Sequence, residues 1–159
     1  MRRDNPLKHF AIAFAIAIVI YVAFYAGIEH RRTRKGPWMV TFTNTAAGDA
    51  EVIVNQPFLA ITNQVIRFPG ESVGTNAPST LSFAQPRQVP YPVPFGRCVF
   101  MDATFLPGTL TLQFFGHELE FLPRVLIIDH QEHPWRTEPV IVLSGTNRAV
   151  KAADTDQSR

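Results

Sequence analysis

The stretch from Phe10 to Ile28 constrains this chain more than any other feature. Its residues, FAIAFAIAIVIYVAFYAGI, include no charged side chain and no proline. As a helix rising 1.5 Å per residue they would span about 28 Å, close to the ~30 Å hydrocarbon core of a bilayer. The stretch is apolar on every face, so it lacks the polar side that a surface helix shows to water. We therefore predict a transmembrane helix over residues 10–28.

The segments on both sides of the predicted span are basic. Residues 1–9 form a short tail with Arg2, Arg3 and Lys8, like the charged start of a signal sequence. Cleavage behind Ala26 would place the bulky Phe24 at the −3 position, so an uncleaved signal anchor is expected. The side chains expected to anchor it are Phe10, Phe14, Ile18, Tyr21, Tyr25 and Ile28.

Residues 29–37 are predicted to be a basic juxtamembrane linker, closed by Gly36 and Pro37. Its cations could contact anionic headgroups, or serve only as a stop-transfer flank. Basic residues are nearly balanced across the span, so the positive-inside rule decides little. We expect the short tail to remain inside and the domain to lie on the extracytoplasmic (periplasmic) side. The candidate headgroup contacts are Arg31, Arg32, Arg34 and Lys35.

Charge and cysteine content limit the partners of the remaining chain. Residues 37–145 carry five arginines and no lysine against nine carboxylates, a net of −4. Nucleic-acid binding needs a basic face, so no nucleic-acid partner is expected. The expected partners are the lipid bilayer and other membrane-protein subunits. The single cysteine, Cys98, excludes a disulfide within the chain and is expected to be a buried thiol.

From Trp38 the hydrophobic period changes from helical to two, which is typical of half-buried strands. About eight or nine short strands separated by turn residues predict an all-β domain over residues 38–145, an antiparallel β-sandwich or small barrel. A flexible tail is expected over residues 146–159. The predicted strands cover residues 38–43, 51–56, 59–68, 80–84, 96–105, 109–114, 118–121, 125–128 and 140–143.

A proline-rich stretch and one hairpin are the clearest local patterns in this domain. The sequence QPRQVPYPVPFG cannot form a central strand and is predicted to cross along a sheet edge, or to dock in an aromatic groove. A type II′ turn at Gly116-His117 would pair Phe114 with Leu119 and place Gln113 opposite Glu120. The apolar run 125–128 predicts a strand buried on both faces or shared between chains.

Three histidines are the candidate metal ligands. His130 and His133 stand three residues apart beside carboxylates, in what is predicted to be a loop before Pro134. Imidazoles with neighbouring carboxylates are the donors that zinc and other divalent ions use. His117, at the predicted hairpin tip, could complete the set only if the fold brings the two loops together. A solvated polar loop explains the same residues, so no metal and no cofactor is predicted.

Other catalytic patterns are weak. Asp102, Glu118 and Glu120 could supply two acids for glycosidic chemistry, which needs them a few ångströms apart, but a solvated strand face fits them as well. Trp38 and Trp135 could stack on a sugar ring, although anchoring or core packing is the better explanation. No nucleophile or phosphate-loop motif is present.

The expected function follows from the anchor and from the weakness of these patterns. We expect a single-pass membrane protein, not an enzyme, whose β-domain acts through protein contacts as an accessory, scaffolding or assembly subunit of a membrane complex. One alternative is a membrane-tethered module that binds a carbohydrate or small ligand. A second is a metal-dependent enzyme that uses the His130/His133 loop.

Overall fold

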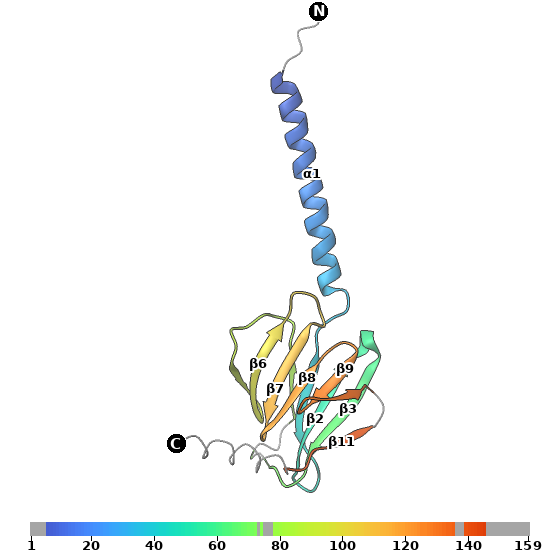
Figure 1. Ribbon diagram of the computed structural model, residues 1–159, viewed down its shortest axis with the longest axis vertical. Helices are drawn as coiled ribbons and strands as arrows, with labels where there is room; N and C mark the ends of the chain where they lie inside the picture. The colour runs from blue at the N-terminus through green and yellow to red at the C-terminus, as the bar shows by residue number, and fades with distance from the viewer. Residues whose placement is uncertain (1–5, 73, 75–77, 136–138, 146–159) are drawn as a thin grey trace, which may run out of the picture. The chain divides into compact units, whose positions relative to one another are not determined.

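The computed structural model of the chain describes residues 6–72, 74, 78–135 and 139–145. The outer part of the predicted N-terminal tail, residues 1–5, and the predicted C-terminal tail, residues 146–159, lie outside the described residues. The chain divides between Arg34 and Lys35 into two units, a helix and a β-domain (Figure 1).

The helical unit is longer than predicted. Helix α1 (Pro6–Thr33) extends the predicted span at both ends and begins with a proline, whose missing N–H costs nothing at the first helical position. Residues 6–32 have a mean hydropathy of 2.5 over the most apolar window, and none of that window is buried by the described residues. Among the described residues, one helix is long and apolar enough to cross a membrane, and it lies near the N-terminus.

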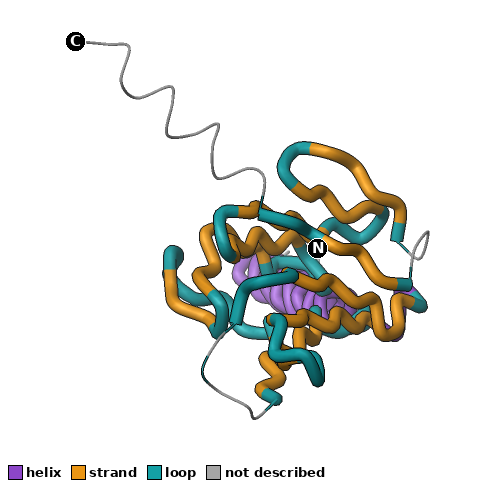
Figure 2. The backbone as a smooth tube through the Cα atoms, turned by 90° about the horizontal axis from the view of Figure 1, so that it is seen from below, coloured by secondary structure: helices purple, strands orange, loops and turns teal. Residues whose placement is uncertain are grey.

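The β-domain consists of two facing sheets, which confirms the predicted sandwich (Figures 1 and 2). Sheet A has the order β11-β3-β2-β1-β4 and sheet B the order β10-β9-β8-β7-β6-β5. Sheet A contains β1 (Met39–Asn44), β2 (Ala50–Gln56), β3 (Ile61–Phe68), β4 (Ser79–Ser82) and β11 (Val140–Val142). Sheet B contains β5 (Tyr91–Val93), β6 (Gly96–Asp102), β7 (Thr109–Phe114), β8 (His117–Phe121), β9 (Val125–Ile128) and β10 (Gln131–Pro134).

Most strands pair with the strand that precedes or follows them in the chain. Sheet B is a meander in which each strand pairs with the next one along the chain. Sheet A is a three-stranded meander flanked by two later strands, and β11 is its one parallel strand, beside β3. The proline-rich stretch contributes β5, an edge strand, as the prolines require.

The core lies between the sheets and is filled by alternate residues of the strands. Phe42 and Phe68 of sheet A meet Phe114 of sheet B edge-to-face, with ring centroids 5.7 and 6.2 Å apart. Trp38 and Phe121 meet in the same way at 5.7 Å. Such aromatic pairs stabilise a core beyond the area that they bury. Cys98 is a free, buried thiol in this core, as predicted.

The register predicted for the β7–β8 hairpin is wrong by two residues. The turn is Phe115-Gly116, with φ of 50° and 90°, and it pairs Phe114 with His117 and Leu112 with Leu119. Positive φ at both turn residues is the type I′ geometry of two-residue hairpins. A shift of two leaves every side chain on its face, so alternation alone could not choose between the registers.

Two other expectations need correction. The strand over 125–128 is not buried on both faces, because Val125 and Ile127 are only half-buried on its outer side. The predicted 130–133 loop is instead the end of a hairpin: Asp129 and His130 form its turn, with φ of 49° and 68°, and His133 lies in β10 opposite Leu126. The two-residue turn was not predicted, because the sequence around it shows a continuous apolar run over residues 125–128 and then Pro134, not two alternating strands.

The predicted linker over 29–37 is also not one segment. Residues 29–33 continue α1, and Lys35 begins the β-domain unit. Arg31, Arg34 and Lys35 are exposed, whereas Arg32 is half-buried and pairs with Glu29 at 2.9 Å. All six predicted anchoring side chains, Phe10, Phe14, Ile18, Tyr21, Tyr25 and Ile28, are at least 48% exposed on α1.

Candidate functional site

His117 is not grouped with the other candidate ligands, because its ring is hydrogen-bonded to Asp129. It lies in β8 with 5% of its surface exposed, not at the hairpin tip where it was predicted. Its Nδ1 is 2.6 Å from Oδ2 of Asp129, and Oδ1 of Asp129 accepts the backbone N–H of Glu118 at 2.9 Å. These bonds tie the β9–β10 turn to the start of β8.

The structure brings His130 together with two carboxylates instead of with the other histidines. Among the described residues, one ligand atom each from Glu118, Glu120 and His130 lies within 4.8 Å of the other two. Both glutamates point outward from β8, and His130 approaches them from the β9–β10 turn. His133 lies further along β10 and is not part of this group. All three residues are candidates in the sequence, but their spacing does not indicate that they lie together.

Neighbouring contacts hold this outer group in place. Gln113, opposite Glu118 on β7, donates its Nε2–H to Oε2 of Glu118 at 2.9 Å. Arg97, opposite Gln113 on β6, donates its Nε–H to Oε1 of Gln113 at 2.9 Å. Two carboxylates and one imidazole can bind a divalent cation such as Zn²⁺ or Mn²⁺, with water in the remaining positions.

Of the three carboxylates that were candidates for paired-acid chemistry, Asp102 lies away from Glu118. Asp102 ends β6 opposite Thr109, whereas Glu118 lies opposite Gln113. Four residues of β7 separate these positions, about 13 Å at 3.3 Å per residue. Asp102 instead accepts the backbone N–H of Thr104 at 2.8 Å, and this bond lowers the pKa of its carboxyl group.

Trp38 belongs to the core, whereas Trp135 is half-buried and packs against it. Trp38 is 2% exposed and lies 5.3 Å from the ring of Trp135. Trp38 donates its indole N–H to the carbonyl of Gly108 at 3.0 Å, and Trp135 donates to that of Leu122 at 2.8 Å. Trp38 therefore offers no open face on which a sugar could stack.

Tyr91 of the edge strand β5 lies opposite Cys98 of β6. Burial, and then the neighbouring Cys98 thiol, raise the pKa of Tyr91 well above its usual range. Burial also raises the pKa of Cys98. Neither group is ionised at neutral pH, so neither is poised as a nucleophile.

Sheet A presents an aliphatic row on its outer face. The register aligns Ile53, Val65 and Val140 across β2, β3 and β11, and all three are half-buried. In the next row Val142 is 57% exposed beside Arg67. We call these three residues and the neighbouring Val142 together the outer aliphatic row (Ile53, Val65, Val140 and Val142).

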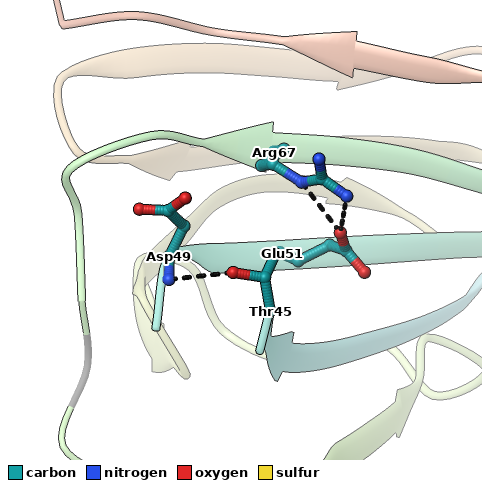
Figure 3. Close-up of polar contacts among 4 residues, drawn as sticks. All are labelled: Thr45, Asp49, Glu51 and Arg67. Carbon is teal, nitrogen blue, oxygen red and sulfur yellow. Dashed lines mark hydrogen bonds and ion pairs between the residues drawn. The ribbon is translucent and has the colours of Figure 1, made fainter. Parts of the chain in front are cut away.

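An ion pair borders the outer aliphatic row. Arg67 donates from Nε and Nη2 to Oε2 of Glu51, at 3.1 and 2.9 Å (Figure 3). Nearby, the backbone N–H of Asp49 donates to Oγ1 of Thr45 at 3.1 Å and closes the β1–β2 loop (Figure 3). The Arg67 side chain is 39% exposed and that of Glu51 14%, so the arginine is the member of the pair that a partner can reach.

Gln56 was missed in the sequence analysis, although it is fully buried. Its Nε2 lies 2.9–3.0 Å from the backbone carbonyl oxygens of Lys35, Gly36 and Pro37. Its Oε1 accepts the backbone N–H of Phe58 at 2.9 Å, which caps the 3₁₀ turn η1 (Pro57–Leu59). The Gln56-Pro57 pair at a strand end was the available signal, since proline often begins a helical turn.

We call the end of the sandwich that carries Lys35 and Gln56 the proximal end. Two large apolar side chains are exposed there: Phe58 in η1, at 68%, and Phe105 in the β6–β7 loop, at 58%.

Comparison with models of protein families, with curated proteins and with solved structures finds no match to this chain.

Proposed function

We propose that this chain is a single-pass membrane protein whose β-sandwich acts through protein contacts, as an accessory, scaffolding or assembly subunit of a membrane complex. The observation that carries the proposal is α1. None of its apolar window is buried by the part of the chain that the structure describes. In water that surface would be unfavourable at ~25 cal/mol per Å² of apolar area, whereas a bilayer accommodates it.

The outer aliphatic row supports the protein-contact part of this proposal. Its members come from three neighbouring strands and lie beside the Glu51–Arg67 pair. Aliphatic surface with charges at its rim is the composition of a protein interface. The occupant we propose is another membrane-protein subunit with an aliphatic surface of its own.

Native size separation tests the protein-contact proposal. Membranes containing the chain are extracted in mild detergent after crosslinking, and the proteins that migrate with it are identified. We expect a larger assembly of fixed composition, which Val142→Glu disrupts and Glu132→Gln, an exposed change on sheet B, leaves intact. Migration of the unmodified chain alone would contradict the proposal.

We propose further that the domain lies on the extracytoplasmic side, because the short basic segment before the span is the part that tends to stay inside. A membrane-impermeant thiol reagent tests this on the variant Ala47→Cys with Cys98→Ala, since Ala47 is an exposed loop residue. Labelling in intact cells is expected. Labelling only after the membrane is broken would place the domain inside.

The group of Glu118, Glu120 and His130 favours one second candidate function, a tethered domain that binds a divalent cation. Equilibrium dialysis of the purified full chain against Zn²⁺ or Mn²⁺ tests it. About one bound ion per chain is expected, lost in Glu120→Gln and retained in Glu132→Gln, where the carboxylate lies outside the group. Equal binding by both variants would remove this candidate.

A further inference from the structure

The proximal end of the sandwich exposes both aromatic rings and cations. Besides Phe58 and Phe105 it exposes two cations, Lys35 and Arg124. Asp102, an exposed carboxylate at the end of β6, accepts a hydrogen bond from the backbone N–H of Thr104. Exposed aromatic rings interspersed with Lys and Arg are typical of protein surfaces at the headgroup level of a bilayer.

Both aromatic loops are fastened to the first four residues of the domain. Gln56 joins η1 to the carbonyls of Lys35, Gly36 and Pro37, as described above. The ring of Phe58 lies so near Gly36 that a Cβ there would meet it at 3.2 Å, and Gly36 has φ +67°. On the other side, Trp38 bonds the carbonyl of Gly108, whose N–H donates to the carbonyl of Phe105 at 2.7 Å.

Chain length then limits how far this end can be from a membrane. Lys35 follows the last residue of α1, Thr33, by two positions. Two residues span at most ~7 Å of extended chain, whatever direction the chain takes between them. The hydrogen bonds of Gln56 prevent residues 35–37 from serving as a longer tether. The predicted span ends at Ile28, five helical residues before Thr33, so a bilayer that holds residues 10–28 lies within about 15 Å of Lys35.

From these observations we infer that the proximal end is a lipid-docking surface, in which Phe58 and Phe105 enter the headgroup–acyl boundary while Lys35 and Arg124 contact anionic headgroups. The inference rests on the proposed membrane anchor and adds to it a fixed orientation of the domain. The occupant is the bilayer itself, because it is the one surface that the chain connectivity places beside these two loops.

Site-specific fluorescence tests the docking. In a Cys98→Ala background, single cysteines at Phe58, Phe105, Val142 and Ile18 carry an environment-sensitive dye. The full chain is reconstituted in vesicles of neutral and anionic phospholipid that contain headgroup-level nitroxide quenchers. Val142 is the matched control: it is 57% exposed and pairs with Arg67, six residues along β3 from Ile61, about 20 Å at 3.3 Å per residue.

The outcomes separate docking from anchoring. Docking predicts several-fold stronger quenching, with blue-shifted emission, at positions 58 and 105 than at position 142. Dye at position 18 reports the anchor, because Ile18 lies within the apolar window of α1. A protected dye at 18 with equal, weak quenching at 58, 105 and 142 would overturn the docking inference alone. A water-exposed dye at 18 would overturn the membrane anchor as well.

Discussion

At the scale of single residues, the structure depends on polar groups whose partners are distant in sequence. Gln56 is the clearest case, since one buried amide contacts four backbone groups. We expect Gln56→Ala to lower the free energy of unfolding by about 1–3 kcal/mol, because it removes the hydrogen bonds that one buried side-chain amide makes to the backbone. Denaturant titration of the full chain in detergent, followed by near-ultraviolet circular dichroism, measures this.

The matched control for that prediction is Gln131→Ala. Gln131 is exposed on β10, so its loss should change stability by less than about 0.5 kcal/mol. Equal effects of the two substitutions would mean that Gln56 does not fasten the proximal end.

Cys98 gives a second prediction at this scale. Burial disfavours the thiolate, and the pKa of the thiol is therefore raised. At pH 8 the native chain should react slowly with a thiol reagent, and the rate should keep increasing with pH above the usual pKa of a cysteine. The comparison is Phe100→Cys in a Cys98→Ala background, an exposed position that should react fast. Similar rates at both positions would contradict the burial of Cys98.

At the scale of secondary-structure elements, local patterns predicted which segments are strands but not how they pair. Alternation located β1, β2, β7 and β8 because period two is a local property. The register of β7 and β8 was missed because it is set by two contacts outside the hairpin pattern. Phe115 takes a left-handed conformation and places its ring 5.2 Å from that of Phe68, and His117 pairs with Asp129 from another hairpin.

Substitution of the glycine in this turn tests its left-handed backbone conformation. Gly116 has φ of 90°, a conformation that alanine adopts only with strain. We expect Gly116→Ala to lower the free energy of unfolding by about 1 kcal/mol or more. Gly74→Ala is the control, because nothing lies within 4 Å of a Cβ built there and its φ is not left-handed. A stabilised Gly116→Ala variant would contradict the type I′ turn.

The candidate site shows the same limit of sequence reasoning. Glu118, Glu120 and His130 were each visible in the sequence, but their grouping depends on β8, β9 and the turn at Asp129-His130. The three-residue spacing of His130 and His133 suggested a shared site, and the hairpin instead places His133 along β10. Spacing within a segment predicts a site only when the secondary structure of that segment is known.

At the scale of the whole molecule, the sequence predicted the division into an apolar helix and a two-sheet domain. Hydropathy and hydrophobic period suffice for that division, because both are sums over many residues. The way in which the domain begins was not predictable. The buried amide of Gln56 removes Lys35, Gly36 and Pro37 from the expected linker and makes them part of the sandwich.

The central claim is that α1 remains on the chain and anchors it in a membrane. Alkaline extraction of membranes, with the intact mass of the retained protein, tests it most directly. We expect the full chain in the membrane pellet with residues 10–28 present. The variant Ile16→Arg with Ile20→Arg should be released, because each charge at a helix centre costs ~2.5–3.5 kcal/mol, whereas Ile16→Ala with Ile20→Ala should remain. Release of the unmodified chain, or a mass that lacks this segment, would contradict the account.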